Sequence, residues 1–555
     1  MTTLAPARPA VPTRGKQFGR TEPRLWTRPL RELTAETSLG FEVIQFALVV
    51  LGIDLYPWQK WLLIHALELL PDGQYRFKRI VVLVARQQGK TTLASVLAAW
   101  WLFVDSARHP EQTPPLKFKV VGVAQNLDIA REPWSAVKTW CDPKPETDEE
   151  EALAIQSLQT ATAKVSDTNG KESIVARSRA HYEIRAGKNV RGKPAARVLM
   201  DEMREQKDWT VWNAVSQTSK SFWNGMLFGF SNAGDVSAIV LRTQRDAAIA
   251  DEAEWAEYVE SGLMSAEEFA NTRDVTLGHF EWSAPDGCEK DDVEGILQAN
   301  PSIGYGPMTV ASALADIRGM TDAGYRTEVL CQWVTSLVDS FIDVKDWKAL
   351  NVAISEVTIP LGSRTVWGID TSADRSRTWI AAAVMTEDGK PFVTVRLERA
   401  GMMWVPDYMA ELAEKSKWRE VVLQAKGCPA MEFIQPLTDK GLTVHAIEGS
   451  QFALATGRMK DRVRDSGLVT VEQPDITTAV EGGVTHKYAA NLAWDRHGSL
   501  PVDISGLIAE SVALYGLELL EPPPPEPTPP PPPQAEMVTR ADATPSDVNL
   551  ATAQF

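Results

Sequence analysis

The sequence is poor in the features that mark several large classes of protein. Its 555 residues include only four cysteines and no CxxC pair; they stand at Cys141, Cys288, Cys331 and Cys428. This excludes a dense disulfide framework and a zinc site built on cysteines, and it fits a reduced compartment. No apolar run follows the N-terminal charges, and the stretch from Leu93 to Val104 is too short to cross a bilayer of about 30 Å. We therefore expect a soluble, intracellular protein without a membrane partner.

An excess of positive charge is also absent. The chain has 57 basic and 73 acidic side chains, a formal net charge of -16. This balance argues against a protein that coats nucleic acid by bulk charge, although it is compatible with a local basic track. With 44% hydrophobic residues the chain can bury sizeable cores, and its length predicts either three or four domains or two large ones.

The two ends differ in composition from the rest. Residues 1–31 hold seven basic side chains against one acid, and we predict a basic, flexible arm over 1–38. Residues 521–534 contain ten prolines in fourteen positions. Proline has no amide donor, so we predict a polyproline II spacer there and a disordered, Pro-rich tail over 521–555.

Between these ends the pattern predicts two α/β domains, at 39–235 and 363–520. In the first, short apolar runs alternate with helical patterns, which favours a mostly parallel sheet. Its predicted strands are 80–84, 119–124, 198–200 and 226–230, with a helix from about residue 90. The second has predicted strands at 365–370, 380–385, 392–396, 421–423 and 444–447. The segment 236–362 is more helical, and we expect it to form a lid and connector.

The residues from Ala85 to Thr92, ARQQGKTT, form the most informative motif. A β-branched strand runs into Gly-Lys-Thr and an apolar helix follows, which is the context of a phosphate-binding loop, although Val84 stands where the first glycine is usual. In such a loop the backbone N–H groups and the helix N-terminus face a polyphosphate. We predict that Lys90 reaches the β/γ oxygens of ATP and that Thr91 ligates Mg²⁺. Further contacts to the nucleotide are predicted from Gln88, Gly89 and Thr92.

A second half of an ATP site follows about 110 residues downstream, where the apolar strand Arg197–Met200 ends in Asp201 and Glu202. We predict that Asp201 holds the Mg²⁺ and that Glu202 polarises the attacking water. Taken alone, the acid pair would fit a solvated strand end.

Two further side chains are candidates for this site. A guanidinium at Arg86, inside the loop, would sense or neutralise charge developing on the γ-phosphate; a solvent-facing loop arginine is the alternative. The amide of Gln59 would pair with the edges of adenine.

At this point the chain resembles the large terminase subunit of tailed bacteriophages or prophages, the motor that packages DNA into procapsids. The resemblance covers about residues 40–520 and rests on motifs in family order. They are the loop with its early arginine, the segment Asn189–Lys193 (NVRGK), Ser231–Gly234 (SNAG) as a coupling motif, Glu281–Gly287 (EWSAPDG) and Ala299–Ser302 (ANPS).

The resemblance implies an N-terminal P-loop (ASCE-type) ATPase and a C-terminal nuclease of the RNase H-like fold, dependent on Mg²⁺ or Mn²⁺. It implies ATP-driven packaging of double-stranded viral DNA and endonuclease cleavage of the concatemer. The implied partners are double-stranded DNA, a portal protein, a small terminase subunit and further copies of the chain in a ring on the portal. The implied location is the host cytoplasm and, transiently, the procapsid portal, but not the mature virion.

A two-metal nuclease needs carboxylates that converge from different strands. Asp370, at the end of the first strand of the second domain, is a good first ligand, and Asp503 matches the third acid of the family. A helix N-cap is the alternative role for Asp503. The second acid is missing, because Gln424 stands at that strand end, and an amide oxygen brings no charge to Mg²⁺.

Three outcomes remain for the missing acid: Glu448 substitutes for it, Asp374 moves in, or the nuclease is weak or lost. His486 and Asp495 lie near the third strand and would assist or remain on the surface. Two other functions also remain open. One is a P-loop helicase or translocase without nuclease activity; the other is a non-enzymatic capsid scaffold that docks through the Pro-rich tail.

Overall fold

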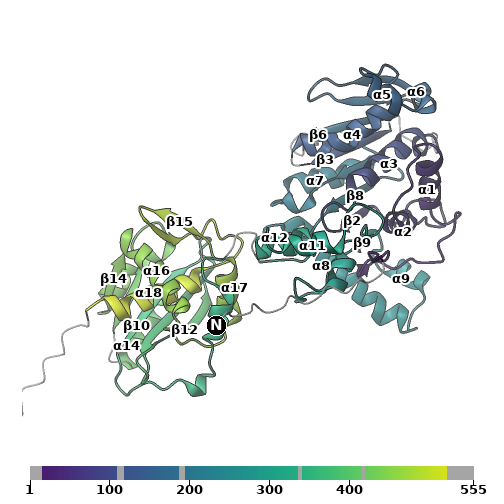
Figure 1. Cartoon of the computed structure of the whole chain (residues 1–555). Helices are drawn as coiled ribbons and strands as arrows, with labels where there is room; N and C mark the ends of the chain where they lie inside the picture. Colours follow the sequence, from purple (N-terminus) through teal and green to yellow (C-terminus); the bar gives the residue numbers. More distant parts are fainter. Residues whose placement is uncertain are drawn as a thin grey trace, which may run out of the picture.

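The computed structural model describes residues 16–108, 118–124, 126–186, 194–335, 340–415 and 419–521. It consists of two lobes, each built on its own sheet (Figure 1). The predicted proline-rich tail, residues 1–15 of the basic arm and the Asn189–Lys193 motif lie outside the described residues. Among the described helices, none combines the length and the apolar character that a membrane span requires.

The N-terminal lobe contains a nine-stranded sheet in the order β1-β9-β2-β8-β7-β3-β6-β5-β4. Its six central strands are parallel: β9 (Leu277–Glu281), β2 (Arg79–Leu83), β8 (Met226–Ser231), β7 (Arg197–Met200), β3 (Lys119–Ala124) and β6 (His181–Ala186). Antiparallel strands complete the two edges: β1 (Leu25–Trp26), β5 (Ser173–Ala176) and β4 (Thr162–Ser166). The mostly parallel sheet predicted from the alternating pattern is therefore confirmed.

Helices cover both faces of this sheet, which explains why its central strands read as continuous apolar runs. Alternate residues of β2 face opposite cores: Ile80 and Val82 enter one, Val81 and Leu83 the other. The longer helices are α1 (Gly40–Val49), α2 (Pro57–Ala66), α3 (Lys90–Phe103), α4 (Leu127–Cys141), α7 (Trp209–Thr218) and α8 (Ile239–Trp255). Shorter ones are α5 (Asp148–Leu153), α6 (Gln156–Ala161), α9 (Ala266–Thr272), α10 (Val293–Ala299), α11 (Val310–Asp316) and α12 (Asp322–Glu328).

The prediction of a flexible arm over 1–38 is wrong for residues 16–38. Strand β1 pairs with β9, and the Trp26 ring packs edge-on against Trp61 with 4.7 Å between centroids. Arg24 donates from Nη2 to Ser283 Oγ at 2.8 Å. Aromatic packing and β-pairing hold the backbone of this segment in place. Basic residues such as Arg24 therefore form tertiary contacts here.

The prediction that 236–362 is only a lid and connector is also wrong in part. Its strand β9 lies between β1 and β2 in the sheet and supplies fully buried residues such as Phe280. Strand β9 was not predicted, because it has only five residues and stands among helical segments. Its burial makes it part of the N-terminal lobe.

The C-terminal lobe has a five-stranded sheet in the order β12-β11-β10-β13-β14. Strands β10 (Thr365–Thr371), β11 (Arg377–Met385) and β12 (Pro391–Ala400) form an antiparallel meander, and β13 (Glu420–Gln424) and β14 (Thr443–Ile447) run parallel to β10. Numbered from β10, this is the 3-2-1-4-5 order of the RNase H-like fold. The five strands predicted for this domain are all present.

Helix α18 (Ser505–Leu519) packs closely against β10. A Cβ at Gly368 would collide with the carbonyl oxygen of Ala509, so the glycine permits this approach. The other helices of the lobe are α13 (Val344–Ala349), α14 (Val405–Lys415), α15 (Ile434–Asp439), α16 (Ser450–Arg464) and α17 (Pro474–Gly482). A hairpin of β15 (Thr485–Tyr488) and β16 (Asn491–Trp494) precedes α18. The close packing brings the end of β10 next to the start of α18.

Candidate functional site

The predicted phosphate loop joins the end of β2 to the start of α3. Gln87 (φ 59°) and Gly89 (φ 88°) adopt left-handed conformations, which let successive backbone N–H groups turn toward one side. The Lys90 amine lies within the loop, 3.0 Å from Val84 O and 3.1 Å from Ala85 O, and burial lowers its pKa. The loop thus holds a cation and a helix N-terminus at the carboxyl end of a central strand.

The side chain of Gln88 points into the protein, away from the space that a nucleotide would occupy. The side chain is fully buried: Nε2 donates to Asn300 Oδ1 at 3.0 Å, and Oε1 accepts from Ser302 N at 3.0 Å. The Ser302 hydroxyl also donates to Gln88 O at 2.9 Å. The Ala299–Ser302 motif therefore holds the back of the phosphate loop, and only the backbone of Gln88 is left to meet a phosphate.

Gln59 has a comparable structural role. Its Oε1 accepts from Tyr56 N at 2.9 Å, and its Nε2 donates to Gly89 O at 3.0 Å. Because the acceptor is already used inside the protein and the residue is 2% exposed, the predicted pairing with both edges of adenine does not fit this geometry. Gln59 instead links the first turn of α2 to the phosphate loop.

The acidic half of the site follows β7, and β8 separates β7 from β2. Asp201 and Lys90 are close enough to affect each other's pKa; burial raises the pKa of Asp201, and the lysine opposes this shift. Asp201 Oδ1 accepts from Glu202 N at 2.8 Å, with Glu202 in a left-handed conformation (φ 50°). The tertiary fold brings Lys90, Asp201 and Glu202 to one end of the sheet. Thr91 and Thr92 begin α3 beside them.

Arg86 lies beside the acids and is not a free loop arginine. Its Nε is 2.8 Å from Glu328 Oε2 and its Nη2 is 3.7 Å from Glu202 Oε1. Glu328 also accepts from Arg204 Nη1 at 2.7 Å and from Asn232 Nδ2 at 3.0 Å. No sequence motif pointed to Glu328, which ends a short helix far along the chain. This carboxylate connects the phosphate loop to Asn232 of the predicted coupling motif.

In the C-terminal lobe, Asp370 is fully buried at the carboxyl-terminal part of β10. Both of its oxygens accept from one guanidinium: Arg496 Nε to Oδ2 at 3.0 Å and Nη2 to Oδ1 at 2.7 Å. The remaining nitrogen, Nη1, donates to Gln424 Oε1 at 2.6 Å. The strand-end positions expected to hold a metal are thus bridged by Arg496, which sequence reasoning missed.

Asp503 is close enough to Asp370 to raise its pKa, after the larger effect of burial. Asp503 accepts from Trp379 Nε1 at 3.2 Å and from Ser505 N at 2.9 Å, so it also satisfies an amide in the first turn of α18. With Trp379 and Arg496 it lines a cavity of about 660 Å³. The structure therefore brings Asp370 and Asp503 into one region of the C-terminal lobe.

The substitutes proposed for the missing acid do not reach Asp370. Glu448 pairs with Lys426 at 2.9 Å, and both side chains are at least half exposed. Asp374 accepts from Ser376 Oγ and Ser372 Oγ within its own turn at 2.7 Å, and these bonds lower its pKa to about 2. Among the described residues, no group of three or more Asp, Glu, His or Cys side chains is arranged to hold a metal ion. These residues do not fit a two-metal centre.

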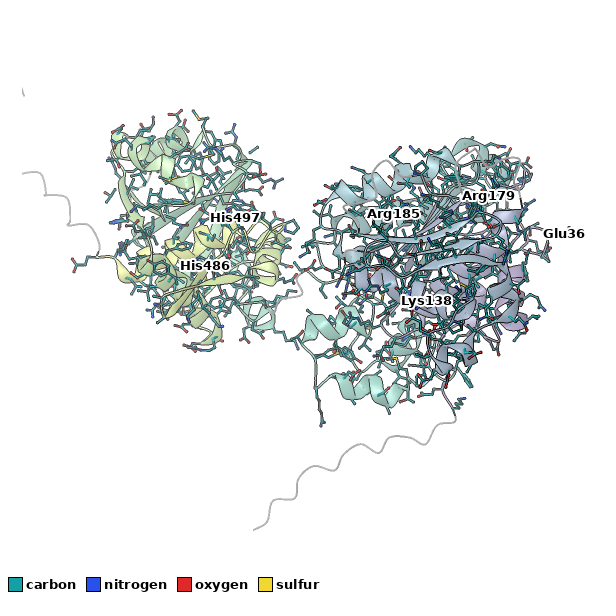
Figure 2. All side chains as sticks on the ribbon, turned by 90° about the horizontal axis from the view of Figure 1, so that it is seen from above. Glu36, Lys138, Arg179, Arg185, His486 and His497 are labelled. Atoms are coloured by element: carbon teal, nitrogen blue, oxygen red, sulfur yellow. The ribbon has the colours of Figure 1, made fainter. Side chains whose placement is uncertain are left out.

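A second cavity, of about 530 Å³, lies beside Gln424 and Arg496 and is lined by His486, Asp495 and His497. Figure 2 labels both histidines on the C-terminal lobe. Asp495 accepts from Gly498 N at 2.9 Å and thus stabilises the turn that carries Arg496. Within the described part of the chain, Asp370 forms no hydrogen bond or ion pair with His486 or Asp495.

The topology and the residues define a P-loop nucleotide-binding fold in which one strand separates the loop strand from the acidic strand, joined to an RNase H-like lobe. No family model and no curated protein matches the sequence. Among solved structures, the HK97 bacteriophage large terminase covers 86% of this chain and 100% of its own, with 16% identity and a TM-score of 0.43. A large terminase from a thermophilic bacteriophage covers 87% and 99%, with 10% identity and a TM-score of 0.31. The large terminase nuclease of thermophilic phage G20c with bound magnesium covers 32% and 98%, with 12% identity and a TM-score of 0.26.

Proposed function

We propose that this chain is a DNA-packaging motor of the large terminase type. Its N-terminal lobe hydrolyses ATP to drive double-stranded viral DNA into a procapsid, and its C-terminal lobe cuts the concatemer. The observation that carries the motor function is the placement of Lys90 and Asp201–Glu202 at the carboxyl ends of β2 and β7, with β8 between them.

The roles in ATP hydrolysis follow from this placement. Lys90 binds the β/γ-phosphate oxygens, and the hydroxyl of Thr91 and the carboxylate of Asp201 are oxygen donors suited to hold Mg²⁺, which neutralises phosphate charge when bound. Glu202 orients and polarises the attacking water. Arg86, which lies 3.7 Å from Glu202, is positioned to respond to charge at the γ-phosphate.

Glu328 supports a route for coupling hydrolysis to movement. It joins Arg86 to Asn232, while Ser231 Oγ accepts from Arg204 N at 3.1 Å, two residues after Glu202. A shift of Arg86 or Glu202 on phosphate release would therefore alter contacts of the Ser231–Gly234 segment. We propose that this segment passes strain to the rest of the motor.

We further propose the partners and location that the sequence motifs imply. These are double-stranded DNA, a portal protein, a small terminase subunit and other copies of this chain in a ring on the portal. The motor would act in the host cytoplasm, transiently at the procapsid portal, and would be absent from the mature virion.

DNA-stimulated ATP hydrolysis by the full chain tests the motor function. Lys90→Ala and Glu202→Ala are each expected to reduce turnover about a hundredfold or more while the circular dichroism spectrum is retained. Lys60→Ala is the control, because Lys60, on α2, forms an exposed ion pair with Asp54. Turnover retained in either site variant, or no turnover by the wild-type protein, contradicts the proposal.

The cleavage half of the proposal has a separate test. The nearness of Asp370 and Asp503 supports it. Mg²⁺ or Mn²⁺ is the cofactor that the resemblance implies, and binding at Asp370 would require Arg496 to be displaced. Plasmid nicking with either ion, abolished by Asp370→Ala, would support cleavage. A DNA translocase or helicase without nuclease activity is the second candidate, and the bond from Arg496 to both oxygens of Asp370 favours it. ATP turnover without any nicking would select that candidate.

A further inference from the structure

Arg496 is bound to the strand-end site by all three of its nitrogens. Two form a fork on the Asp370 carboxylate, at 3.0 and 2.7 Å, and the third reaches Gln424 Oε1 at 2.6 Å. The Asp370 side chain is fully buried and the Arg496 side chain is 10% exposed. A planar guanidinium matches a carboxylate in this two-bond geometry, which makes the contact strong and directional.

The two hydrogen bonds from Arg496 to Asp370 leave few oxygen ligands for a divalent cation. Both oxygens of Asp370 already accept from a positive group, and the charges of the pair cancel. Gln424 is neutral, and Asp503 is a carboxylate close enough to act on both members of the pair. A divalent ion brought next to the guanidinium would meet like charge in a poorly solvated site, and this repulsion opposes binding.

The position of Arg496 is set by packing on both sides. It directly follows the hairpin, whose Trp494 donates from Nε1 to Ser511 Oγ on α18 at 3.0 Å and from N to Thr456 Oγ1 on α16 at 3.2 Å. After it, Ser499 N donates to Asp495 O at 3.0 Å and closes the turn. The guanidinium also lies 5.7 Å from the centre of the Phe452 ring. These contacts hold the arginine in place at Asp370.

We propose that Arg496 is the resident cation of this site and keeps divalent metal ions away from Asp370. Metal binding at Asp370 and Asp503 then requires that the guanidinium be removed or displaced. The proposal concerns the C-terminal lobe alone and holds whether or not the N-terminal lobe drives packaging.

Terbium luminescence provides a test that does not depend on catalysis. Tb³⁺ is a probe for oxygen-rich cation sites, and Trp379, bonded to Asp503, is an energy donor beside this one. The full-length chain is titrated without nucleotide as wild type, Arg496→Gln and Arg377→Gln, each with and without Asp370→Asn. Arg377 is the matched control, since it lines the same cavity and its ion pair with Glu398 is on the surface. The part of the Tb³⁺ luminescence that Asp370→Asn removes is assigned to ions bound at Asp370.

We expect Arg496→Gln to show a saturable signal dependent on Asp370 and displaced by Mn²⁺, with affinity about tenfold or more above wild type. Wild type and Arg377→Gln should show little signal that depends on Asp370. Mn²⁺ should also raise the Tm of Arg496→Gln more than that of wild type.

Two results overturn the proposal. One is wild-type binding that depends on Asp370 and is as tight as in Arg496→Gln. The other is a folded Arg496→Gln protein without any gain. If Arg496→Gln does not fold, Arg496→Lys takes its place, because lysine keeps the charge but cannot bind both Asp370 oxygens and Gln424 together. Its expected affinity for Tb³⁺ lies above that of wild type, and an affinity equal to wild type contradicts the proposal.

Discussion

Arg86 Nε lies 2.8 Å from Glu328 Oε2, so the arginine of the phosphate loop is bonded to the last residue of α12. The same carboxylate binds Arg204, which follows the acidic pair closely. One carboxylate therefore pairs with two arginines, and it lies outside every motif quoted from the sequence.

Replacing Glu328 by Gln should slow ATP hydrolysis about ten- to hundredfold, because Arg86 loses its charged partner and its fixed position beside Glu202. ATP affinity should change much less, since Lys90 is untouched. Single-turnover hydrolysis and nucleotide titration would separate the two effects. Glu205→Gln is the control, as Glu205 is a more exposed partner of Arg204. Equal losses in both variants would contradict this role for Glu328.

Ser302→Ala should weaken the support of the phosphate loop. The change removes the hydrogen bond from Ser302 Oγ to Gln88 O and leaves Trp58 Nε1 without its 3.2 Å acceptor. The free energy of unfolding should fall by about 1–3 kcal/mol, and the KM for ATP should rise. Urea denaturation and steady-state kinetics would measure both. Ser178→Ala, in an exposed turn, should change neither.

Gln424→Asp alone should not increase nuclease activity. The new carboxylate would accept from the Arg496 nitrogen that now bonds Gln424, and so would hold the guanidinium more firmly in the site. Cleavage should increase only when Gln424→Asp is combined with Arg496→Gln. Plasmid nicking in Mg²⁺ and Mn²⁺ would compare the single and double variants, and a gain in the single variant would contradict the expectation.

The stability of the N-terminal lobe should fall at alkaline pH through His279. Burial opposes its charged form, but the carboxylates of Glu252 and Glu281, 3.0 and 3.3 Å from its two ring nitrogens, outweigh burial and raise the pKa of His279 to about 9. The unfolded value is about 6.5, so the protonated network stabilises the fold fully below about pH 6.5, and this contribution is lost as the pH rises through 9. The contribution is on the order of 3 kcal/mol.

Urea unfolding at pH 6 and pH 10 would test this dependence. The difference in unfolding free energy between wild type and His279→Gln should be largest at pH 6 and small at pH 10. A difference that does not change with pH would show that His279 acts through packing alone.

The sequence by itself determined the two α/β lobes, four of the nine strands of the first sheet, all five of the second, and the positions of Lys90, Asp201, Glu202 and Asp370. Such features depend on local order: apolar periodicity, a strand that runs into Gly-Lys-Thr, and acids at strand ends. Short strands such as β1 and β9 were not predicted, because they have few residues and little local pattern. Strand β1 and strand β9 depend on each other for pairing, although more than two hundred residues separate them.

The tertiary structure alone decided what the side chains of the two sites touch. It buried Gln88 against Ser302, brought Glu328 to Arg86, and placed Arg496 on Asp370 across 126 positions of the chain. A strand-end aspartate has the same local pattern whether its partner is a metal or a guanidinium. Which cation it meets depends on the packing of the hairpin, α16 and α18 around β10, and local sequence patterns carry no record of that packing.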